Sequence, residues 1–326
     1  MTRWLVTGAG GMLGRDLTSL LADCGEQVTG LTRADLDITD TTEVRAALET
    51  AKADVVVNCA AWTAVDDAEA HEDAALAVNG QGAANLAAAC AAAGATMIQP
   101  STDYVFGGSA SSPYAEDAAP APRTAYGRTK LAGEQAVLAA LPDSGYVVRT
   151  AWLYGAHGPN FVRTMIRLAR SGASPAVVDD QRGQPTWSAD VARQIRALVS
   201  RGAPAGVYHA TSSGETTWFG LAEEVFALFA AASARAETRE SFPERSVPTP
   251  TTSAAYRRPA PRPAYSVLGH AAWAAAGIAP IGHWRDALHR ASRCASSAGN
   301  ARCRASRQCP IGAMPAAAQA SWPSTL

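Results

Sequence analysis

A glycine-rich turn near the N-terminus constrains the fold of this chain more than any other feature. Residues 5–14, LVTGAGGMLG, predict a strand, a turn and an amphipathic helix, and Gly8, Gly11 and Gly14 follow one another at three-residue spacing. Glycine suits a turn with positive φ, a close backbone approach to a pyrophosphate, and tight packing of a helix on a strand. The N-terminus of the helix would present free N–H groups to phosphates. The segment therefore predicts a dinucleotide-binding βαβ unit.

The rest of the chain continues this pattern in its first half. We expect strands at 4–7, 27–31, 54–58, 96–101 and 146–150, with helices at 13–24, 42–51, 72–93 and 126–141. Such alternation predicts a parallel sheet covered on both faces. Further helices, at 161–171, 188–200 and 218–232, are separated by turn-rich segments. The expected fold class is α/β, a doubly wound parallel Rossmann sheet with a smaller C-terminal substrate lobe.

The domain boundaries follow from these changes of pattern. We expect an NAD(P)-binding Rossmann domain over residues 1–150 and a substrate-binding lobe over 151–290, interleaved with the last sheet strands. Residues 291–326 contain four arginines and no acidic residue, and they show no helical or strand period. We expect this tail to be disordered or aberrant and to contribute nothing to the core.

Composition excludes several classes of protein. The chain has 326 residues, of which 48% are hydrophobic, and a formal net charge of −1, so neither a nucleic acid nor a membrane is an expected partner. No apolar run approaches the ~20 residues of a membrane span, and residues 1–13 do not resemble a secretory signal. Six cysteines at unpatterned spacing indicate reduced thiols. We expect a cytoplasmic protein.

Lysine is rare in this chain, and its position is informative. Only two of the 28 basic residues are lysine, Lys52 and Lys130. Tyr126 and Lys130 form a Tyr-x-x-x-Lys pattern on a predicted helix, which puts both side chains on one face. A neighbouring ammonium favours phenolate, so we expect Lys130 to lower the pKa of Tyr126 toward the range useful for acid–base catalysis. The alternative is a surface contact between residues one helical turn apart.

Lys130 can also reach the ribose hydroxyls of a nicotinamide cofactor, for which the wide fork of an arginine is less suited. Thr102 follows the strand 96–101, at the sheet edge where open α/β sheets bind ligands. Its hydroxyl could hydrogen-bond a substrate carbonyl beside Tyr126, or it could only satisfy the turn that leaves the strand.

The end of the second strand should contact the adenosine ribose, and it carries no acidic residue. Instead Arg33 follows the strand, and a guanidinium there could meet the 2′-phosphate of NADP. We therefore expect NADPH as cofactor, with NADH as the alternative if Arg33 is only a solvated loop charge. Asp37 and Ile38, a few residues further on, are candidates for an adenine-side contact.

Together these residues resemble the extended short-chain dehydrogenase/reductase superfamily, and within it the dTDP-4-dehydrorhamnose reductase family, including relatives in dihydrostreptose and other deoxysugar pathways. The resemblance covers about residues 3–289. Its most specific strings are the segments 58–66 (NCAAWTAVD), 101–106 (STDYVF), 149–155 (RTAWLYG) and 180–186 (DQRGQPT).

The resemblance implies reduction of the C4 ketone of a dTDP-4-dehydro-6-deoxy-L-hexose, with a small dTDP-sugar as substrate. It implies Tyr126 as proton donor, Lys130 as the residue that tunes it and Thr102 as the group that polarises the carbonyl. The implied cofactor contacts are Gly11, Met12, Leu13, Asp37, Ile38, Ala60, Ala61, Thr63, Tyr126 and Lys130, and the implied sugar contacts are Thr102, Asp103 and Trp152.

The nucleotide side of the substrate is less well defined. The loop 180–186 and one of Arg257, Arg258 and Arg262 resemble the diphosphate-binding side, since arginine binds phosphates in a bidentate manner. From the residues alone, Trp152 could equally belong to the core.

Some relatives dimerise around a magnesium ion held by glutamates. Here Asp16 and Asp190 lie near the matching positions with shorter side chains. We therefore expect no obligatory metal, and a monomer or weak homodimer.

Two other functions are compatible with the same fold. A sugar-nucleotide epimerase or dehydratase would use the same cofactor site, but a dehydratase is expected to carry an acidic pair beside Thr102, and here Asp103 is followed by Tyr104. A non-catalytic dinucleotide-binding regulatory subunit would need no tuned phenol. The Tyr126–Lys130 pair favours the reductase.

Overall fold

A computed structural model describes residues 1–235 and 246–296 of the chain. Its centre is a six-stranded parallel sheet in the order β10-β5-β4-β3-β1-β2. The strands are β1 (Arg3–Thr7), β2 (Gln27–Leu31), β3 (Val55–Asn58), β4 (Thr96–Thr102), β5 (Gly145–Thr150) and β10 (Gly206–His209). The expected parallel α/β sheet is confirmed. Its sixth strand, β10, comes from the second half of the chain and pairs with β5.

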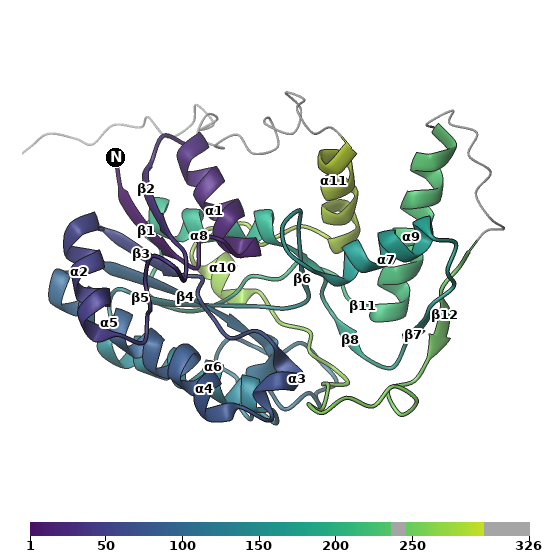
Figure 1. Ribbon diagram of the computed structural model, residues 1–326, viewed down its shortest axis with the longest axis horizontal. Helices are drawn as coiled ribbons and strands as arrows, with labels where there is room; N and C mark the ends of the chain where they lie inside the picture. The colour runs from purple at the N-terminus through teal and green to yellow at the C-terminus, as the bar shows by residue number, and fades with distance from the viewer. Residues whose placement is uncertain (236–245, 297–326) are drawn as a thin grey trace, which may run out of the picture.

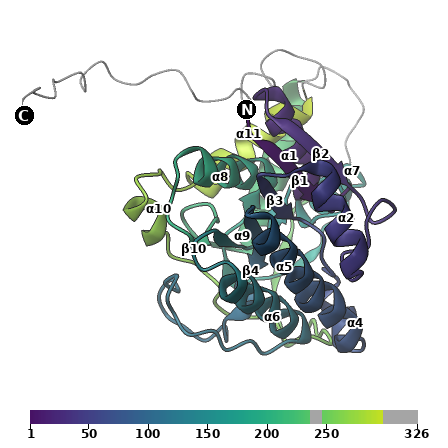
Figure 2. The same ribbon diagram turned by 90° about the vertical axis from the view of Figure 1, so that its left-hand side faces the viewer.

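Helices cover both faces of this sheet, as Figures 1 and 2 show. One face packs against α1 (Met12–Asp23), α8 (Ser188–Ser200) and α10 (Ala271–Ala275). The other packs against α2 (Thr41–Ala51), α5 (Ala83–Ala93) and α6 (Ala125–Ala140). Val55, Val56 and Val57 are fully or almost fully buried between the two layers, which explains why β3 is apolar throughout.

The single helix expected over 72–93 is interrupted in the structure. It consists of α4 (Glu72–Leu76), a π-helical turn η1 (Ala77–Gly82) and α5. Within η1 the Asn79 side chain accepts a hydrogen bond from the Trp62 backbone at 2.9 Å and donates to the Thr129 hydroxyl at 3.1 Å. A Cβ on Gly133 of α6 would lie only 2.2 Å from the Asn79 carbonyl oxygen. The wider turn therefore occurs where the helix contacts α6 and the 59–64 loop. The helical periodicity of the sequence does not indicate such contacts, so a single helix was predicted.

The second half of the chain has its own small apolar core. It is built by α7 (Phe161–Arg170), α9 (Trp218–Arg235) and α11 (Trp284–Ser296). Three short strand pairs surround these helices: β6 (Leu153–Tyr154) with β9 (Thr186–Trp187), β7 (Ala176–Val178) with β12 (Thr249–Thr251), and β8 (Arg182–Gly183) with β11 (Thr216–Thr217). The remaining short elements are α3 (Val65–Ala68) and the 3-10 turn η2 (Asp103–Val105).

The predicted start of the tail at residue 291 is too early, because α11 continues to Ser296. Trp284, Ala287 and Leu288 bury one face of this helix, at the spacing that makes residues neighbours on a helix surface. Arg290 extends the contact with an ion pair to Asp190 at 2.7 Å. Residues 297–326 lie outside the described part of the chain. Within the described residues no helix is long and apolar enough to cross a membrane.

Candidate active site

The turn between β1 and α1 has the geometry that its glycines predict. Gly8 has φ of +61°, and a Cβ on it would lie 2.5 Å from the backbone nitrogen of Ala60. A Cβ on Gly14 would lie 2.4 Å from the Gly8 carbonyl oxygen. Gly11 precedes α1, whose first turn has neither a side-chain cap nor an acidic residue. The exposed N–H groups and the positive end of the helix dipole therefore fit a dinucleotide diphosphate.

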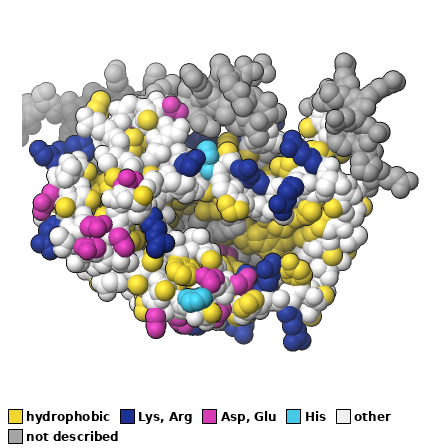
Figure 3. Space-filling view, viewed as in Figure 1, with side chains coloured by type: hydrophobic (Ala, Val, Ile, Leu, Met, Phe, Trp, Pro, Cys, Tyr) yellow, Lys and Arg dark blue, Asp and Glu magenta, His cyan; other side chains and the backbone are white. Residues whose placement is uncertain are grey.

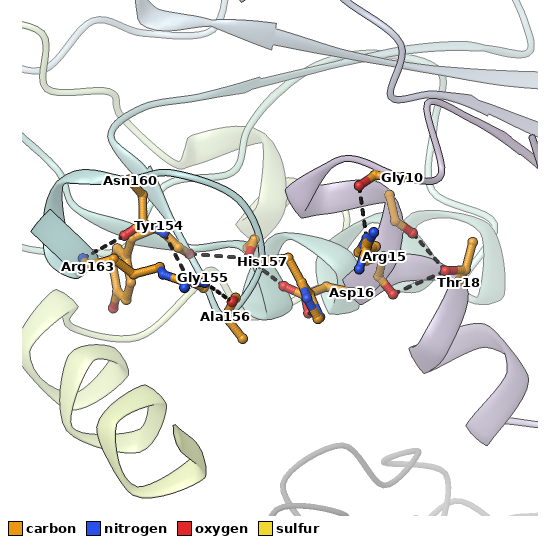
Figure 4. A network of polar contacts seen from close by, with 12 residues as sticks. Gly10, Arg15, Asp16, Thr18, Tyr154, Gly155, Ala156, His157, Asn160 and Arg163 are labelled. Atoms are coloured by element: carbon orange, nitrogen blue, oxygen red, sulfur yellow. Dashed lines mark hydrogen bonds and ion pairs between the residues drawn. The ribbon is translucent and has the colours of Figure 1, made fainter. Parts of the chain in front are cut away.

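The first turn of α1 is also tied to the second half of the chain. Met12 and Leu13 begin the helix, and a Cβ on Gly155 would lie 3.2 Å from Cγ of Met12. One turn later, Asp16 accepts a hydrogen bond from Ser188 at 2.5 Å. Figure 4 shows the loop that follows β6 lying along this end of α1, with His157 directed at Asp16.

The residues expected on the adenosine side lie beyond β2. Arg33 is exposed in the loop, and its charge contributes to lowering the pKa of Asp37, after the larger effect of hydrogen bonds from Thr39. Ile38 is buried, and its carbonyl accepts a hydrogen bond from Asn85 at 3.0 Å. The loop is therefore fixed by its own contacts, while the Arg33 guanidinium stays available to solvent.

The loop after β3 crosses directly beneath the glycine turn. Its residues include Ala60, Ala61 and Thr63, of which Thr63 is exposed and the two alanines half-buried. A chain of buried side chains supports it: the Thr7 hydroxyl donates to Asn58 at 2.7 Å, and the Asn58 amide donates to Gln99 at 2.9 Å. These bonds connect the ends of β1, β3 and β4, and so hold the sheet edge together below the cofactor position.

Four predicted site residues come together where β4 ends and α6 begins. The Lys130 ammonium donates to the carbonyl of Pro100 at 2.7 Å, and its charge acts on the thiol of Cys59 next to the glycine turn. The Thr102 hydroxyl donates to the Asp103 carboxylate at 3.0 Å, and it lies close enough to the Tyr126 phenol to act on its pKa. The structure therefore brings Tyr126 and Lys130 of α6 together with Thr102 and Asp103 at the end of β4.

Several buried polar atoms at this edge have no partner among the described residues. They include the Ser101 hydroxyl, Oδ2 of Asp103 and the indole nitrogen of Trp62. Burying a polar atom without a hydrogen bond costs about 1–3 kcal/mol. Such unsatisfied atoms at the end of β4 and in the loop after β3 indicate a place that a polar ligand completes.

Burial dominates the titration of these groups. It raises the pKa of Tyr126 to about 12, the nearby Asp103 charge acts in the same direction, and the neighbouring Thr102 hydroxyl opposes both. The expectation that Lys130 lowers this pKa is wrong here, because its ammonium is directed at the Pro100 carbonyl and desolvation of the phenol prevails. Burial also lowers the pKa of Lys130 to about 8 and raises that of Asp103 to about 6.

Trp152 belongs to the other side of the site. Its backbone has φ of +47°, and its ring stacks on Trp218 at 3.7 Å between centroids with an interplanar angle of 9°. A Cβ on Gly183 would lie 2.5 Å from the Trp152 ring, so only glycine fits there. In Figure 3 an apolar surface lies where Figure 1 places β8 and β11, with basic side chains gathered above it.

The residues expected on the diphosphate side are divided between two places. In the 180–186 loop, Asp180 accepts hydrogen bonds from the backbone and hydroxyl of Ser253, and the Gln184 amide donates to the Leu268 carbonyl and accepts from the Leu268 backbone N–H. Arg258 and Arg262 instead approach Asp66 of α3, at 3.6 Å and 2.9 Å. Two guanidiniums on one carboxylate leave an excess positive charge near Tyr104, whose ring lies 5.9 Å from the Arg262 guanidinium carbon.

The two residues considered for a metal have protein partners. Asp16 bonds Ser188, while Asp190 pairs with Arg193 and Arg290. Among residues 1–235 and 246–296 no group of three or more potential ligands could hold a metal ion.

Comparison with known proteins decides the family. The family described as RmlD substrate binding domain matches residues 2–295. The chain belongs to this family. A dTDP-4-dehydrorhamnose reductase of Streptomyces griseus is 57% identical over 290 residues, covering 88% of this chain and 91% of that protein. A dTDP-4-keto-6-deoxy-D-glucose reductase of Streptomyces niveus is 53% identical over 289 residues, covering 89% of this chain and 96% of that protein.

A solved structure supports the same family as these two relatives. The dTDP-4-dehydrorhamnose reductase of Bacillus anthracis in complex with NADP superposes with a TM-score of 0.82 at 34% identity, covering 90% of this chain and 99% of that one. The family resemblance predicted from the sequence is confirmed.

The structure adds residues to this family site that the sequence analysis missed. Asn79 and Asn58 support the loops around the position expected for the cofactor, and Asp66 holds Arg258 and Arg262, which are expected on the substrate side. Glu134 and Arg149 form a buried ion pair behind Lys130. A signal existed for Glu134, since a carboxylate one helical turn beyond a lysine, on the same helix face, is an expected partner of that lysine.

Proposed function

We propose that this chain reduces the C4 ketone of a dTDP-4-dehydro-6-deoxyhexose, with NADPH as the hydride donor. The observation that carries the proposal is the meeting of α6 and the end of β4: the Lys130 ammonium donates to the Pro100 carbonyl, and the Tyr126 ring lies edge-on to that of Tyr104, with ring centroids 5.7 Å apart. The relatives named as reductases of dTDP-4-keto sugars, and the NADP complex of one of them, support it.

The side chains of the site can supply the proton that the reduced carbonyl oxygen takes up. With a pKa of about 12, Tyr126 is protonated at neutral pH, which is the state that a donor to a developing alkoxide needs. Thr102 can polarise the carbonyl by a hydrogen bond when its single hydroxyl proton turns from the Asp103 carboxylate to the carbonyl oxygen. The bound nicotinamide supplies the hydride. Lys130 is placed to hold its ribose, with two ammonium protons left after the bond to Pro100.

The finer assignments follow from the same placement. We propose that residues 1–150 bind the cofactor, with Arg33 toward its 2′-phosphate, and that residues 151–290 bind the sugar nucleotide, with Trp152 against the apolar side of the sugar and Arg258 or Arg262 toward the diphosphate. The product would be dTDP-L-rhamnose or its dihydrostreptose equivalent. We further propose a cytoplasmic monomer or weak homodimer with no nucleic acid or membrane partner and no required magnesium.

Tyr126→Phe tests the proton donor directly. We expect kcat to fall by about 10²-fold or more, since general acid catalysis contributes that much, while affinity for NADPH changes little. The assay follows NADPH absorbance with freshly prepared dTDP-4-keto-6-deoxy-L-sugar and NADPH binding by fluorescence. A near-normal rate in the variant would refute the role of Tyr126.

The matched control is Tyr146→Phe, because the Tyr146 hydroxyl donates to the Ala203 carbonyl away from the site. The same assay separates the alternatives. An epimerase or dehydratase would convert the sugar without net consumption of NADPH, and a regulatory subunit would bind NADPH and leave the sugar unchanged.

A further inference from the structure

A buried ion pair lies directly behind the catalytic helix. Arg149 of β5 binds both carboxylate oxygens of Glu134 of α6, with nitrogen–oxygen distances of 2.7, 3.0 and 3.2 Å. The two side chains are 4% and 2% exposed. Phe106 covers the guanidinium from one side, with its ring centroid 5.0 Å away. Such a pair is costly to bury and adds little net stability on average, so its position calls for a reason.

The position of the pair connects it to Lys130. Glu134 follows Lys130 by one helical turn on α6, and both side chains are buried. Lysine and glutamate four residues apart on a helix commonly form an ion pair with each other. Here they do not: Lys130 donates to Pro100 of β4, while Glu134 faces Arg149 of β5. In the β4–β5 register, Pro100 and Ser101 lie opposite Val148 and Arg149, so both anchors belong to the same place in the sheet.

We propose that Glu134 and Arg149 are positioning residues for Lys130: Arg149 holds the Glu134 carboxylate against β5, so that the Lys130 ammonium is directed to β4 and the cofactor instead of pairing along its own helix. The role of Lys130 toward the cofactor rests on the function proposed above. The diversion of its ammonium by the pair rests on the contacts alone.

The groups that act on Lys130 come from several elements. Burial lowers its pKa most, and the charge of Glu134 on α6 acts in the opposite direction; the Cys59 thiol after β3 stays uncharged near neutral pH, since burial raises its pKa to about 12. Pro100 of β4 contributes a neutral carbonyl, and Asn79 of η1 is a neutral amide bonded to Thr129. Arg149 thus controls how strongly the Glu134 charge is felt at the lysine.

Two further groups lie next to Arg149 in the Glu134–Arg149 ion pair. His209 of β10 lies 3.4 Å from the Arg149 guanidinium. Burial, with the Arg149 charge adding to it, lowers the pKa of His209 to about 3, so this imidazole is neutral over the working pH range. The Glu116 carbonyl, at 3.3 Å, takes a further Arg149 donor. Changes at position 149 therefore alter one charge next to Glu134, and no titration of His209 interferes near neutral pH.

The scarcity of lysine makes a direct test feasible. Labelling with ¹³C-lysine places only two side chains, Lys52 and Lys130, in the NMR spectrum of the whole protein. Lys52 is exposed at the end of α2 and serves as internal reference. Titration of the ¹³Cε signals gives the pKa of Lys130 in the free protein, without cofactor or substrate.

The proposal predicts shifts of opposite sign. Glu134→Gln keeps the shape and removes the negative charge, so the pKa of Lys130 should fall, by on the order of 1 pH unit. Arg149→Gln leaves the Glu134 charge uncompensated, so the pKa should rise by a similar amount. A purely structural role would loosen the helix and hydrate the lysine, so both variants would shift it upward. Shifts of equal sign, or no shift, would overturn the proposal.

Two further variants keep the test decisive if a single variant does not fold. Arg149→Lys retains the charge and should give a Lys130 titration close to that of the unchanged protein. The double variant Glu134→Gln/Arg149→Gln has no net charge in the pair and should return the titration toward that value; an upward shift in the folded double variant contradicts the proposal. The pH profile of NADPH oxidation should move with the NMR values. If the variants shift the Lys130 titration as expected but the unchanged protein does not reduce the sugar with NADPH, the proposed function fails. The positioning role of Glu134 and Arg149 would then still hold.

Discussion

The two halves of the site are built by different means. In the cofactor half, the decisive contacts are between backbone atoms of neighbouring elements, as at Gly8, where a Cβ would meet the Ala60 backbone. In the substrate half, the contacts are between side chains from segments far apart in the sequence, such as Trp152 on Trp218 and Arg262 on Asp66.

This difference determines how each half tolerates change. A close contact between two backbone segments leaves no room for a side chain, so almost any substitution at Gly8 or Gly14 should destabilise the turn. A contact between side chains can be altered gradually, through size and charge. The cofactor half is therefore suited to one invariant ligand, and the substrate half to different sugars, in agreement with relatives named for different keto-sugars.

The largest effect is expected where the backbone contact is broken. Gly8→Ala should lower the free energy of unfolding by about 3 kcal/mol or more, since it combines a left-handed φ with overlap against the Ala60 backbone. Gly25→Ala is the matched control, because Gly25 has φ of +75° and no atom within 4 Å of an added Cβ. It should cost only about 1 kcal/mol. Urea denaturation measures both, and equal losses would show that the close approach does not matter.

An intermediate effect is expected in the substrate half. Trp218→Leu removes the ring that stacks on Trp152, and should lower the free energy of unfolding by about 1–2 kcal/mol and weaken binding of dTDP-L-rhamnose several-fold. NADPH affinity should stay unchanged. Trp218→Phe, which preserves an aromatic face, should recover most of both losses. Calorimetry with dTDP-L-rhamnose and with NADPH measures the two affinities, and parallel loss of both would mean that the halves are not separable.

The smallest effect is expected at the ion pairs of Asp66 in the substrate half. Asp66→Asn removes the carboxylate that faces Arg258 and Arg262, and should cost less than about 1 kcal/mol of unfolding free energy, since the three side chains are partly exposed. Asp67→Asn is the control, as Asp67 pairs with the exposed His71. We expect Asp66→Asn alone to change the salt dependence of dTDP binding, measured between low and high ionic strength. The same change in both variants would contradict a specific role for Asp66.

The sequence predicted the cofactor half well because its signals are local. Glycine spacing, apolar runs and strand ends are read from adjacent residues, and the five expected strands and the place of Thr102, Tyr126 and Lys130 agree with the structure. The direction of the Tyr126 pKa could not be read this way, because it depends on how much solvent the fold removes from the phenol.

The substrate half was predicted less completely for the same reason. The pairing of Arg262 with Asp66 joins residues almost two hundred positions apart, and no local pattern indicates it. The stacking of Trp152 on Trp218 likewise depends on the packing of separate segments. By contrast, α11 had a readable signal in Trp284, Ala287 and Leu288, whose helical spacing indicates a helix that leads into the first residues of the expected tail.

The π-helical turn η1 has a consequence for how this chain can change in length. A residue added to or removed from an α-helix rotates everything after it by about 100°. A π-helical turn holds one residue more than the α-helical turn that it replaces, so loss of one residue within Ala77–Gly82 would leave an ordinary helix with α5 in its present orientation. Leu86 would stay in the core and Asn85 on the Ile38 carbonyl, whereas the bonds of Asn79 to Trp62 and Thr129 would be disturbed. A deletion within α5 itself would instead turn Leu86 and Asn85 away from these contacts, so η1 is the one place along this helix where a single-residue deletion should spare the core.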